Sequence, residues 1–129
     1  LDVSGVHSWD EARHGVNAYE MWKSGNFIVS TYRYRTDYWN LKPPLSYWAI
    51  LLGFRLFGTT VLALRAYAAV SMFATVLLTA RFVWKRYGRV ACLASTALLA
   101  CGNIFYSFHY GRTGDADALF GLLFTLCVL

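Results

Sequence analysis

One uncharged run decides the fold class of this chain: it reads VACLASTALLACGNIFYSF and covers residues 90–108. A transmembrane helix needs about 20 apolar residues to cross the hydrocarbon core of a bilayer, so this run is long enough to span one. A second uncharged run, residues 66–80, has Arg65 and Arg81 at its ends. Because arginines at both ends can reach opposite interfaces, the pattern predicts a span over residues 61–84 before the span over residues 90–108.

The composition supports a membrane protein. Hydrophobic residues make up 57% of the 129 residues and charged residues only 15%, whereas a soluble domain carries about 25% charged residues. Intrinsic disorder is excluded, because it requires low hydrophobicity and high net charge. A disulfide scaffold is also excluded, since the cysteines are odd in number and lie in apolar runs without metal-ligand spacing: Cys92, Cys101 and Cys127.

The net charge of +5 is concentrated where the chain is most hydrophobic. All seven cations of residues 41–90 lie there without a single anion, which is typical of a membrane protein and indicates no nucleic-acid partner. The short loop 85–89 is cationic and is predicted to be cytoplasmic by the positive-inside rule. Residues 1–60 and the loop 109–117 are then extracytoplasmic, and together they contain all seven acidic residues.

The last apolar run, residues 118–129, is too short to cross a bilayer. It predicts a third membrane helix that is truncated at the end of the chain, so we expect this chain to be a fragment. The predicted fold class is thus an all-α integral membrane protein with two to three transmembrane helices, placed in a plasma membrane with several passes.

The first sixty residues predict two helices too short to span, lying across the ends of the membrane helices. Ser8 and Glu11 fit a capping box for a helix that ends at Gly25. Its apolar face is predicted from four side chains: Val16, Tyr19, Met21 and Trp22.

Residues 27–39 are aromatic and polar and predict an extended loop. Pro43 and Pro44 suit the first turn of a second helix over residues 45–56, which we expect in the outer interface because it carries Trp48. The break before the first span is expected at Gly58.

Three polar clusters are predicted on the extracytoplasmic side. They are Asp10-Glu11 with Arg13 and His14, then Lys42 before two prolines, and then HYGRTGDAD, residues 109–117, with Arg112, Asp115 and Asp117. Each has an ordinary explanation: a helix N-terminus favours acidic residues, a lysine can snorkel, and an aspartate can cap a helix. Together they indicate a site that binds an anion and moves a proton, because a carboxylate can act as a base and the cations can hold a phosphate.

Five segments follow one another in a recognisable order: WDEARHGVNAYEMWKSGNF (9–27), LKPPLSYWAILLGFRLFG (41–58), LRAYAAVSMF (64–73), RFVWKRYG (81–88) and GRTGDADALFGLLFTL (111–126). This order resembles the N-terminal part of polyprenyl-phosphate-dependent glycosyltransferases of the GT-C fold. The most similar groups are the lipid A aminoarabinose transferases and the protein O-mannosyltransferases.

The resemblance implies an enzyme that moves a sugar from a polyprenyl-phosphate donor to a lipid or protein acceptor, with inversion at the anomeric carbon. It implies catalytic roles for Asp10, Glu11 and Asp117, with Asp10 as the general base. It implies contacts to the donor phosphate from three cations: Lys42, Arg13 and Arg112.

No cofactor is certain from the resemblance. Leu41 stands where the aminoarabinose transferases usually carry a glutamate, a possible metal ligand, and this puts a divalent metal site in doubt. Two alternatives stay open at this stage. One is a non-catalytic membrane subunit or transporter segment, and the other is an inactive homologue that keeps the fold.

Overall fold

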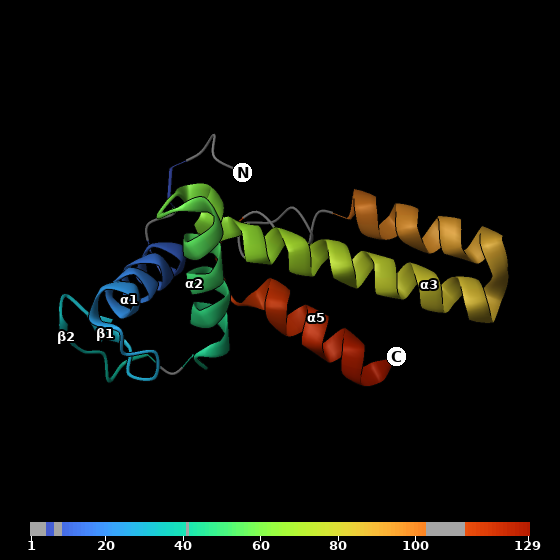
Figure 1. Ribbon diagram of the computed structural model, residues 1–129. Coiled ribbons are helices and arrows are strands. Elements are labelled where there is room, and N and C mark those ends of the chain that lie inside the picture. Colours follow the sequence, from blue (N-terminus) through green and yellow to red (C-terminus); the bar gives the residue numbers. More distant parts are fainter. Residues whose placement is uncertain (1–4, 7–8, 41, 103–112) are drawn as a thin grey trace. The chain divides into compact units, whose positions relative to one another are not determined.

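The computed structural model describes residues 5–6, 9–40, 42–102 and 113–129. Helices dominate, in agreement with the expected all-α class, and the elements in chain order are α1 (Asp10–Ser24), β1 (Thr31–Tyr32), β2 (Arg35–Thr36), α2 (Leu45–Phe57), α3 (Val61–Cys101) and α5 (Asp117–Val128) (Figure 1). The chain forms two compact units. The first contains residues 1–67 and 113–115, and the second contains residues 68–112 and 116–129.

Helix α1 begins and ends close to its predicted limits. Asp10 and Glu11 occupy its first turn, where the positive end of the helix dipole favours carboxylates. Its C-terminal Gly25 adopts a left-handed conformation with φ of 70° and donates its N–H to the Met21 carbonyl oxygen at 3.0 Å. The predicted stop at Gly25 is confirmed. Ser8, the expected cap, lies outside the described residues.

The predicted apolar face of α1 is confirmed at Met21, which is 1% exposed and lies in the core, and is wrong at the other three positions. Val16 and Tyr19 are each 38% exposed and Trp22 is 40% exposed. The buried face is largely polar and consists of Glu11, His14, Asn17, Ala18, Glu20 and Met21. This face can be buried because partners from distant parts of the chain satisfy several of its polar groups, as described below for the site.

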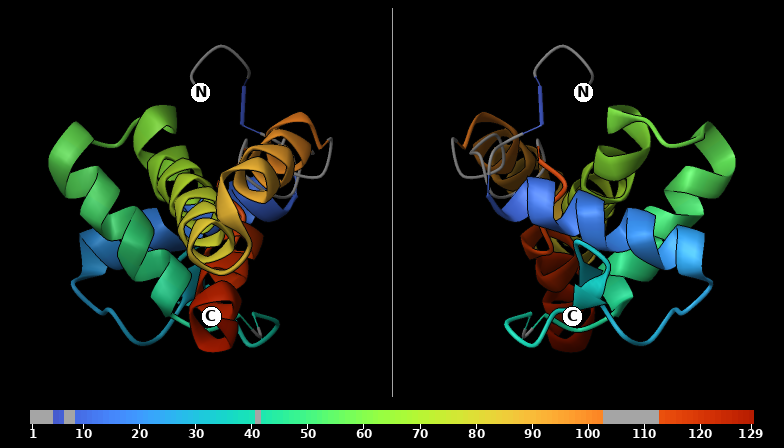
Figure 2. Two further views of the ribbon diagram at one scale, coloured as in Figure 1. Left: turned by 90° about the vertical axis from the view of Figure 1, so that its right-hand side faces the viewer. Right: turned by 90° about the vertical axis from the view of Figure 1, so that its left-hand side faces the viewer.

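The core of the first unit lies where α1 packs against α2 and the first turns of α3 (Figure 2). It consists of Ala18, Met21, Tyr47, Ile50, Leu51, Phe54, Ala63 and Leu64. Gly53 of α2 faces the backbone of α3 so closely that a Cβ there would overlap the Ala63 carbonyl oxygen. Helix α2 ends at Phe57, and Gly58 has φ of 71°, which confirms the break expected at Gly58.

The expected extended loop contains a tight antiparallel hairpin. Thr31 pairs with Thr36, and the turn between the strands places Arg33 and Tyr34 at φ of 55° and 60°. Left-handed backbone costs a non-glycine residue roughly 1–2 kcal/mol. A hydrogen bond compensates in part, since the Tyr34 N–H donates to Glu20 Oε2 at 3.1 Å and so ties the turn to α1.

The second unit is built around the long helix α3. Gly88 alone is non-helical within it, with φ of 86° and ψ of −177°, and the chain doubles back there (Figure 1). The loop expected over residues 85–89 is therefore reduced to one residue, because a glycine can reverse the chain without further loop residues. The two arms touch where the Cys92 thiol donates to the Ala80 carbonyl oxygen at 3.4 Å.

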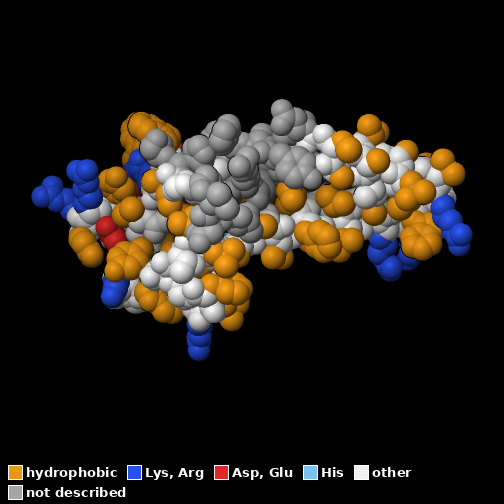
Figure 3. All heavy atoms as spheres, turned by 90° about the horizontal axis from the view of Figure 1, so that it is seen from above, with side chains coloured by type: hydrophobic (Ala, Val, Ile, Leu, Met, Phe, Trp, Pro, Cys, Tyr) orange, Lys and Arg blue, Asp and Glu red, His pale blue; other side chains and the backbone are white. Residues whose placement is uncertain are grey.

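Of the helices in the described ranges, α3 is the one with the length and hydropathy to cross a membrane. Apolar side chains cover its surface, and cations gather at the end where it reverses (Figure 3). These exposed cations are Arg81, Lys85, Arg86 and Arg89. Helix α5 has 12 residues, too few for a span. Residues 103–108 of the second predicted span lie outside the described residues.

Candidate functional site

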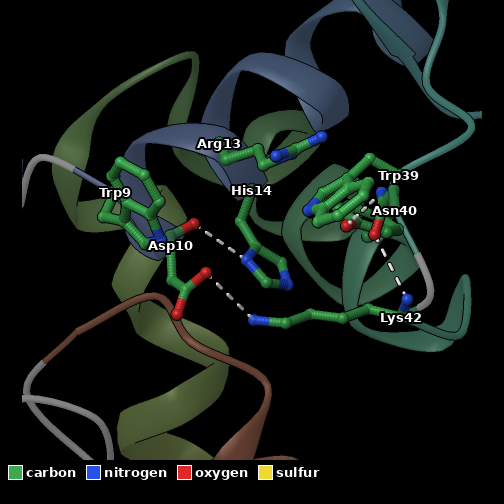
Figure 4. Close-up of a pocket in the computed structure, with 8 residues that line it drawn as sticks. Trp9, Asp10, Arg13, His14, Trp39, Asn40 and Lys42 are labelled. Carbon is green, nitrogen blue, oxygen red and sulfur yellow. Dashed lines mark hydrogen bonds and ion pairs between the residues drawn. The ribbon is translucent and has the colours of Figure 1, made fainter.

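A pocket of about 200 Å³ opens in the first unit between the start of α1 and the segment that precedes α2 (Figure 4). Its lining is Trp9, Asp10, Arg13, His14, Trp39, Asn40, Lys42 and Tyr47. Four of these residues, Asp10, Arg13, His14 and Lys42, belong to the polar clusters that the sequence predicted at a site. The two tryptophans lie on opposite sides of the pocket in Figure 4, so the cavity combines flat aromatic surfaces with charged groups.

Asp10 and Lys42 face each other across this pocket. Lys42 Nζ lies 3.6 Å from Asp10 Oδ1, and the two side chains are 38% and 40% exposed. An ion pair this open to solvent contributes little to stability, typically about 0–1 kcal/mol. Either group can therefore leave the ion pair and bind a ligand at a small cost in stability.

His14 lies in the middle of the pocket, between Asp10 and Trp39 (Figure 4). It is buried, its Nδ1 is 2.9 Å from the Asp10 carbonyl oxygen, and its ring stacks on Tyr47 with centroids 5.1 Å apart. Burial lowers the pKa of the imidazole, and the positive charge of Lys42 lowers it further. The ring is thus neutral at pH 7.

Arg13 is held by Asp37. Its Nη2 lies 2.6 Å from Asp37 Oδ1 and its Nε 3.1 Å from Oδ2, and the amide of Asn17 donates to the same carboxylate at 3.2 Å. The hydrogen bonds from Arg13 hold the pKa of Asp37 below its usual value. Arg13 was expected to contact the donor phosphate, but its charge is already matched by a carboxylate.

The sequence did not single out the short segment that carries Lys42 into position. Asn40 accepts the Lys42 N–H at 3.2 Å and donates its side-chain N–H to the Tyr47 hydroxyl at 2.7 Å. The backbone N–H of Trp39 donates to Asp37 Oδ1 at 3.2 Å. An Asn two residues before a Pro-flanked lysine is a typical turn former, and this signal could have located the segment.

Glu11 has a different environment from its neighbour Asp10. Its carboxylate accepts two bonds from the Arg65 guanidinium, 2.6 Å from Nε and 2.9 Å from Nη2, and a third from the Gly114 N–H at 2.9 Å. Arg65 and Glu11 are 1% and 0% exposed. Glu11 is not among the residues that line the pocket.

The same buried pair holds residues 113–115 in the first unit. Arg65 also donates to the Gly5 carbonyl oxygen at 2.9 Å, and the Tyr67 hydroxyl donates to the Gly114 carbonyl oxygen at 2.8 Å. A Cβ at Gly114 would come within 2.8 Å of Leu64 Cγ, so only glycine fits there without displacing α3. Thr113 donates to Asp115 Oδ2 at 2.8 Å.

The remaining expected site residues are not placed at this pocket. Asp117 is the first residue of α5 in the second unit, where Ala116 and not Asp117 occupies the N-cap. Arg112 and Leu41 lie outside the described residues. Within the part of the chain that the structure describes, no group of three His, Cys, Asp or Glu side chains could hold a metal ion.

Comparison with known proteins supports the resemblance seen in the sequence. Residues 41–129 match the family model described as dolichyl-phosphate-mannose-protein mannosyltransferase. Two uncharacterized proteins of Aquifex aeolicus (strain VF5) are similar: one is 34% identical over 95 residues, 72% of this chain, and the other is 33% identical over 131 aligned positions, 98% of this chain. No solved structure matches.

The chain corresponds to 22% and 25% of the lengths of these two relatives, so it spans about a quarter of the curated proteins that it matches. The family model covers more than half of the chain, and one helix has the length and hydropathy of a membrane span. The chain therefore belongs to the dolichyl-phosphate-mannose-protein mannosyltransferase family, which consists of membrane glycosyltransferases of the GT-C type.

Proposed function

We propose that this chain forms part of a membrane glycosyltransferase that moves a sugar from a polyprenyl-phosphate donor to a lipid or protein acceptor on the extracytoplasmic face. The observation that carries the proposal is the pocket in which the Asp10 carboxylate meets the Lys42 ammonium between two tryptophan rings. A base, a cation and aromatic surfaces are what a sugar phosphate and an attacking hydroxyl require.

In the proposed reaction, Asp10 takes the proton from the acceptor hydroxyl as its oxygen attacks the anomeric carbon of the sugar. The bond between that carbon and the phosphate oxygen breaks, the configuration inverts, and polyprenyl phosphate leaves with the bonding electrons. Lys42 neutralises the charge that develops on the leaving phosphate. The aromatic rings of Trp9 and Trp39 offer flat faces on which a sugar can stack.

The other expected residues take secondary roles in this proposal. Arg13 orders the pocket wall through Asp37, and Glu11 fixes the start of α1 through Arg65. Asp117 and Arg112 stay candidates for catalysis and for phosphate binding in the intact protein. The alternative, a non-catalytic membrane subunit, predicts that neither Asp10 nor Lys42 affects sugar transfer.

Substituting Lys42 tests the phosphate contact. In the intact protein, Lys42→Ala is expected to weaken binding of undecaprenyl phosphate by about 1.5–3 kcal/mol, because it removes a charge-assisted bond. Binding can be measured by quenching of tryptophan fluorescence in detergent, since Trp9 and Trp39 line the pocket. The matched control is Lys23→Ala, because Lys23 lies in the last turn of α1 and its ammonium is over the Tyr19 ring. Equal affinities of the wild type and Lys42→Ala would refute the contact.

The orientation of the chain in the membrane is a second proposal, based on the cations at the reversal of α3. Tyr38 is 90% exposed and Tyr87 is 70% exposed, so each suits a single cysteine in a protein whose native cysteines are replaced. A membrane-impermeant thiol reagent on intact cells should label position 38 and spare position 87, which should react only after permeabilisation. Labelling of position 87 alone on intact cells would show that the chain has the opposite orientation.

A further inference from the structure

His14 has a buried polar atom that the structure leaves without a partner. The imidazole is 2% exposed, and its Nε2 makes no hydrogen bond within the described residues. Leaving a buried polar group unpaired costs about 1–3 kcal/mol, so such an atom at a pocket calls for an explanation.

The geometry fixes which nitrogen carries the proton. The Asp10 carbonyl oxygen can only accept, so Nδ1, at 2.9 Å from it, must be the N–H donor. With its pKa lowered by burial, the ring is neutral and Nε2 presents a lone pair. Nε2 is therefore a hydrogen-bond acceptor, not a donor, in the ligand-free pocket.

The Lys42 side chain runs beneath the imidazole on its way to Asp10 (Figure 4). The ion pair that holds it there is open to solvent and long, at 3.6 Å. His14, Asp10 and Lys42 all line this pocket. The pocket therefore offers two acceptors, Asp10 and Nε2, and one cation.

We propose that His14 is a specificity-determining residue of the site, because its Nε2 accepts a hydrogen bond from a hydroxyl group of the substrate. This inference rests on the proposed function, because a sugar phosphate supplies the anion for Lys42 and hydroxyl groups for the acceptors. The hydroxyl belongs either to the donor sugar or to the acceptor molecule. Stacking on Tyr47 and the bond to Asp10 hold the imidazole in the orientation that this contact needs.

Two substitutions separate the acceptor atom from the rest of the ring. His14→Asn keeps an N–H donor near the position of Nδ1 and removes the acceptor at Nε2. His14→Gln keeps an acceptor near the position of Nε2. Thermal unfolding of both variants in detergent shows that they are folded before any binding is compared.

The test uses the intact protein with two probes, undecaprenyl phosphate and undecaprenyl-phosphate mannose. His14→Asn is expected to bind the mannose-bearing lipid about three- to tenfold more weakly, the equivalent of one neutral hydrogen bond, and the bare lipid as the wild type does. His14→Gln is expected to recover most of the loss. This outcome identifies the donor sugar as the source of the hydroxyl.

If both lipids bind normally to His14→Asn but transfer of labelled mannose in native membranes falls three- to tenfold, with recovery in His14→Gln, the hydroxyl belongs to the acceptor. Wild-type binding and transfer in His14→Asn would overturn the proposal, and so would equal losses in the Asn and Gln variants, which indicate a packing role. A normal affinity of Lys42→Ala for bare undecaprenyl phosphate would instead contradict the proposed function, so the two failures are distinguishable.

Discussion

Asp10→Asn in the intact protein is expected to lower kcat for sugar transfer by a factor of about 10² to 10⁴, the usual contribution of a positioned general base. Asparagine keeps the shape of the side chain and can still accept a hydrogen bond, but it cannot take up the proton of the acceptor hydroxyl. Transfer of labelled sugar from the lipid-phosphate donor under saturating conditions measures this loss.

The affinity for undecaprenyl phosphate distinguishes a variant that lacks the general base from a variant whose binding site is disrupted. Asp10→Asn removes the carboxylate that pairs with Lys42 at 3.6 Å, so the affinity for the lipid phosphate should stay the same or rise. Asp10→Glu, which keeps a carboxylate, is the matched control and should retain more activity than Asp10→Asn. Near-normal turnover of Asp10→Asn would mean that Asp10 only stabilises the start of α1, and Glu11 or Asp117 would then be the next candidate for the base.

Local signals predicted the helix limits of the first unit well. Pro43 and Pro44 placed the start of α2, and Gly25 and Gly58 placed the ends of α1 and α2, because each of these residues restricts or frees its own backbone. The hairpin had no such signal. Arg33 and Tyr34 adopt left-handed conformations usually taken by glycine or asparagine, and their turn is held by a hydrogen bond to Glu20, 14 residues before Tyr34.

The site was predictable only in part, because some of its contacts also join residues distant in the sequence. Asp10 and Lys42 stand in motifs that resemble a known family, and the structure brings them together. The pairing of Arg13 with Asp37 depends on contacts between residues 24 positions apart, which no local pattern encodes. His14 was one member of a polar cluster in the sequence, and only its burial and its unpaired Nε2 single it out.

The polar buried face of α1 is the clearest example of a feature that local sequence patterns do not predict. Hydrophobic periodicity assigned Val16 and Trp22 to the core, but polar side chains of α1 are buried against partners distant in the chain, such as Arg65, 54 residues after Glu11. The buried arginine Arg65 needs a carboxylate partner, and α1 therefore buries the face that carries Glu11. Sequence periodicity cannot reveal a partner so distant in the chain.

Breaking this ion pair is expected to have the largest effect on stability. Arg65→Met removes the guanidinium that donates two hydrogen bonds to the buried Glu11 carboxylate, and removal of one partner of a buried pair typically costs about 3–5 kcal/mol. Lys42→Met is the matched control, because it breaks a solvent-exposed pair and should cost about 1 kcal/mol or less. Chemical unfolding of the intact protein in detergent, followed by tryptophan fluorescence, compares the two.

A double substitution then decides between a structural and a catalytic Glu11. Glu11→Leu with Arg65→Met replaces the pair by apolar side chains, which often restores most of the stability lost in the single variant. If Glu11 only fixes the start of α1 and residues 113–115, the restored protein should also regain sugar transfer to within about tenfold of the wild type, a loss of less than about 1.4 kcal/mol in the transition state. A double variant that is stable but has lost transfer by a factor of 10² or more, the contribution of an acid or base, would show that Glu11 acts in catalysis beside Asp10.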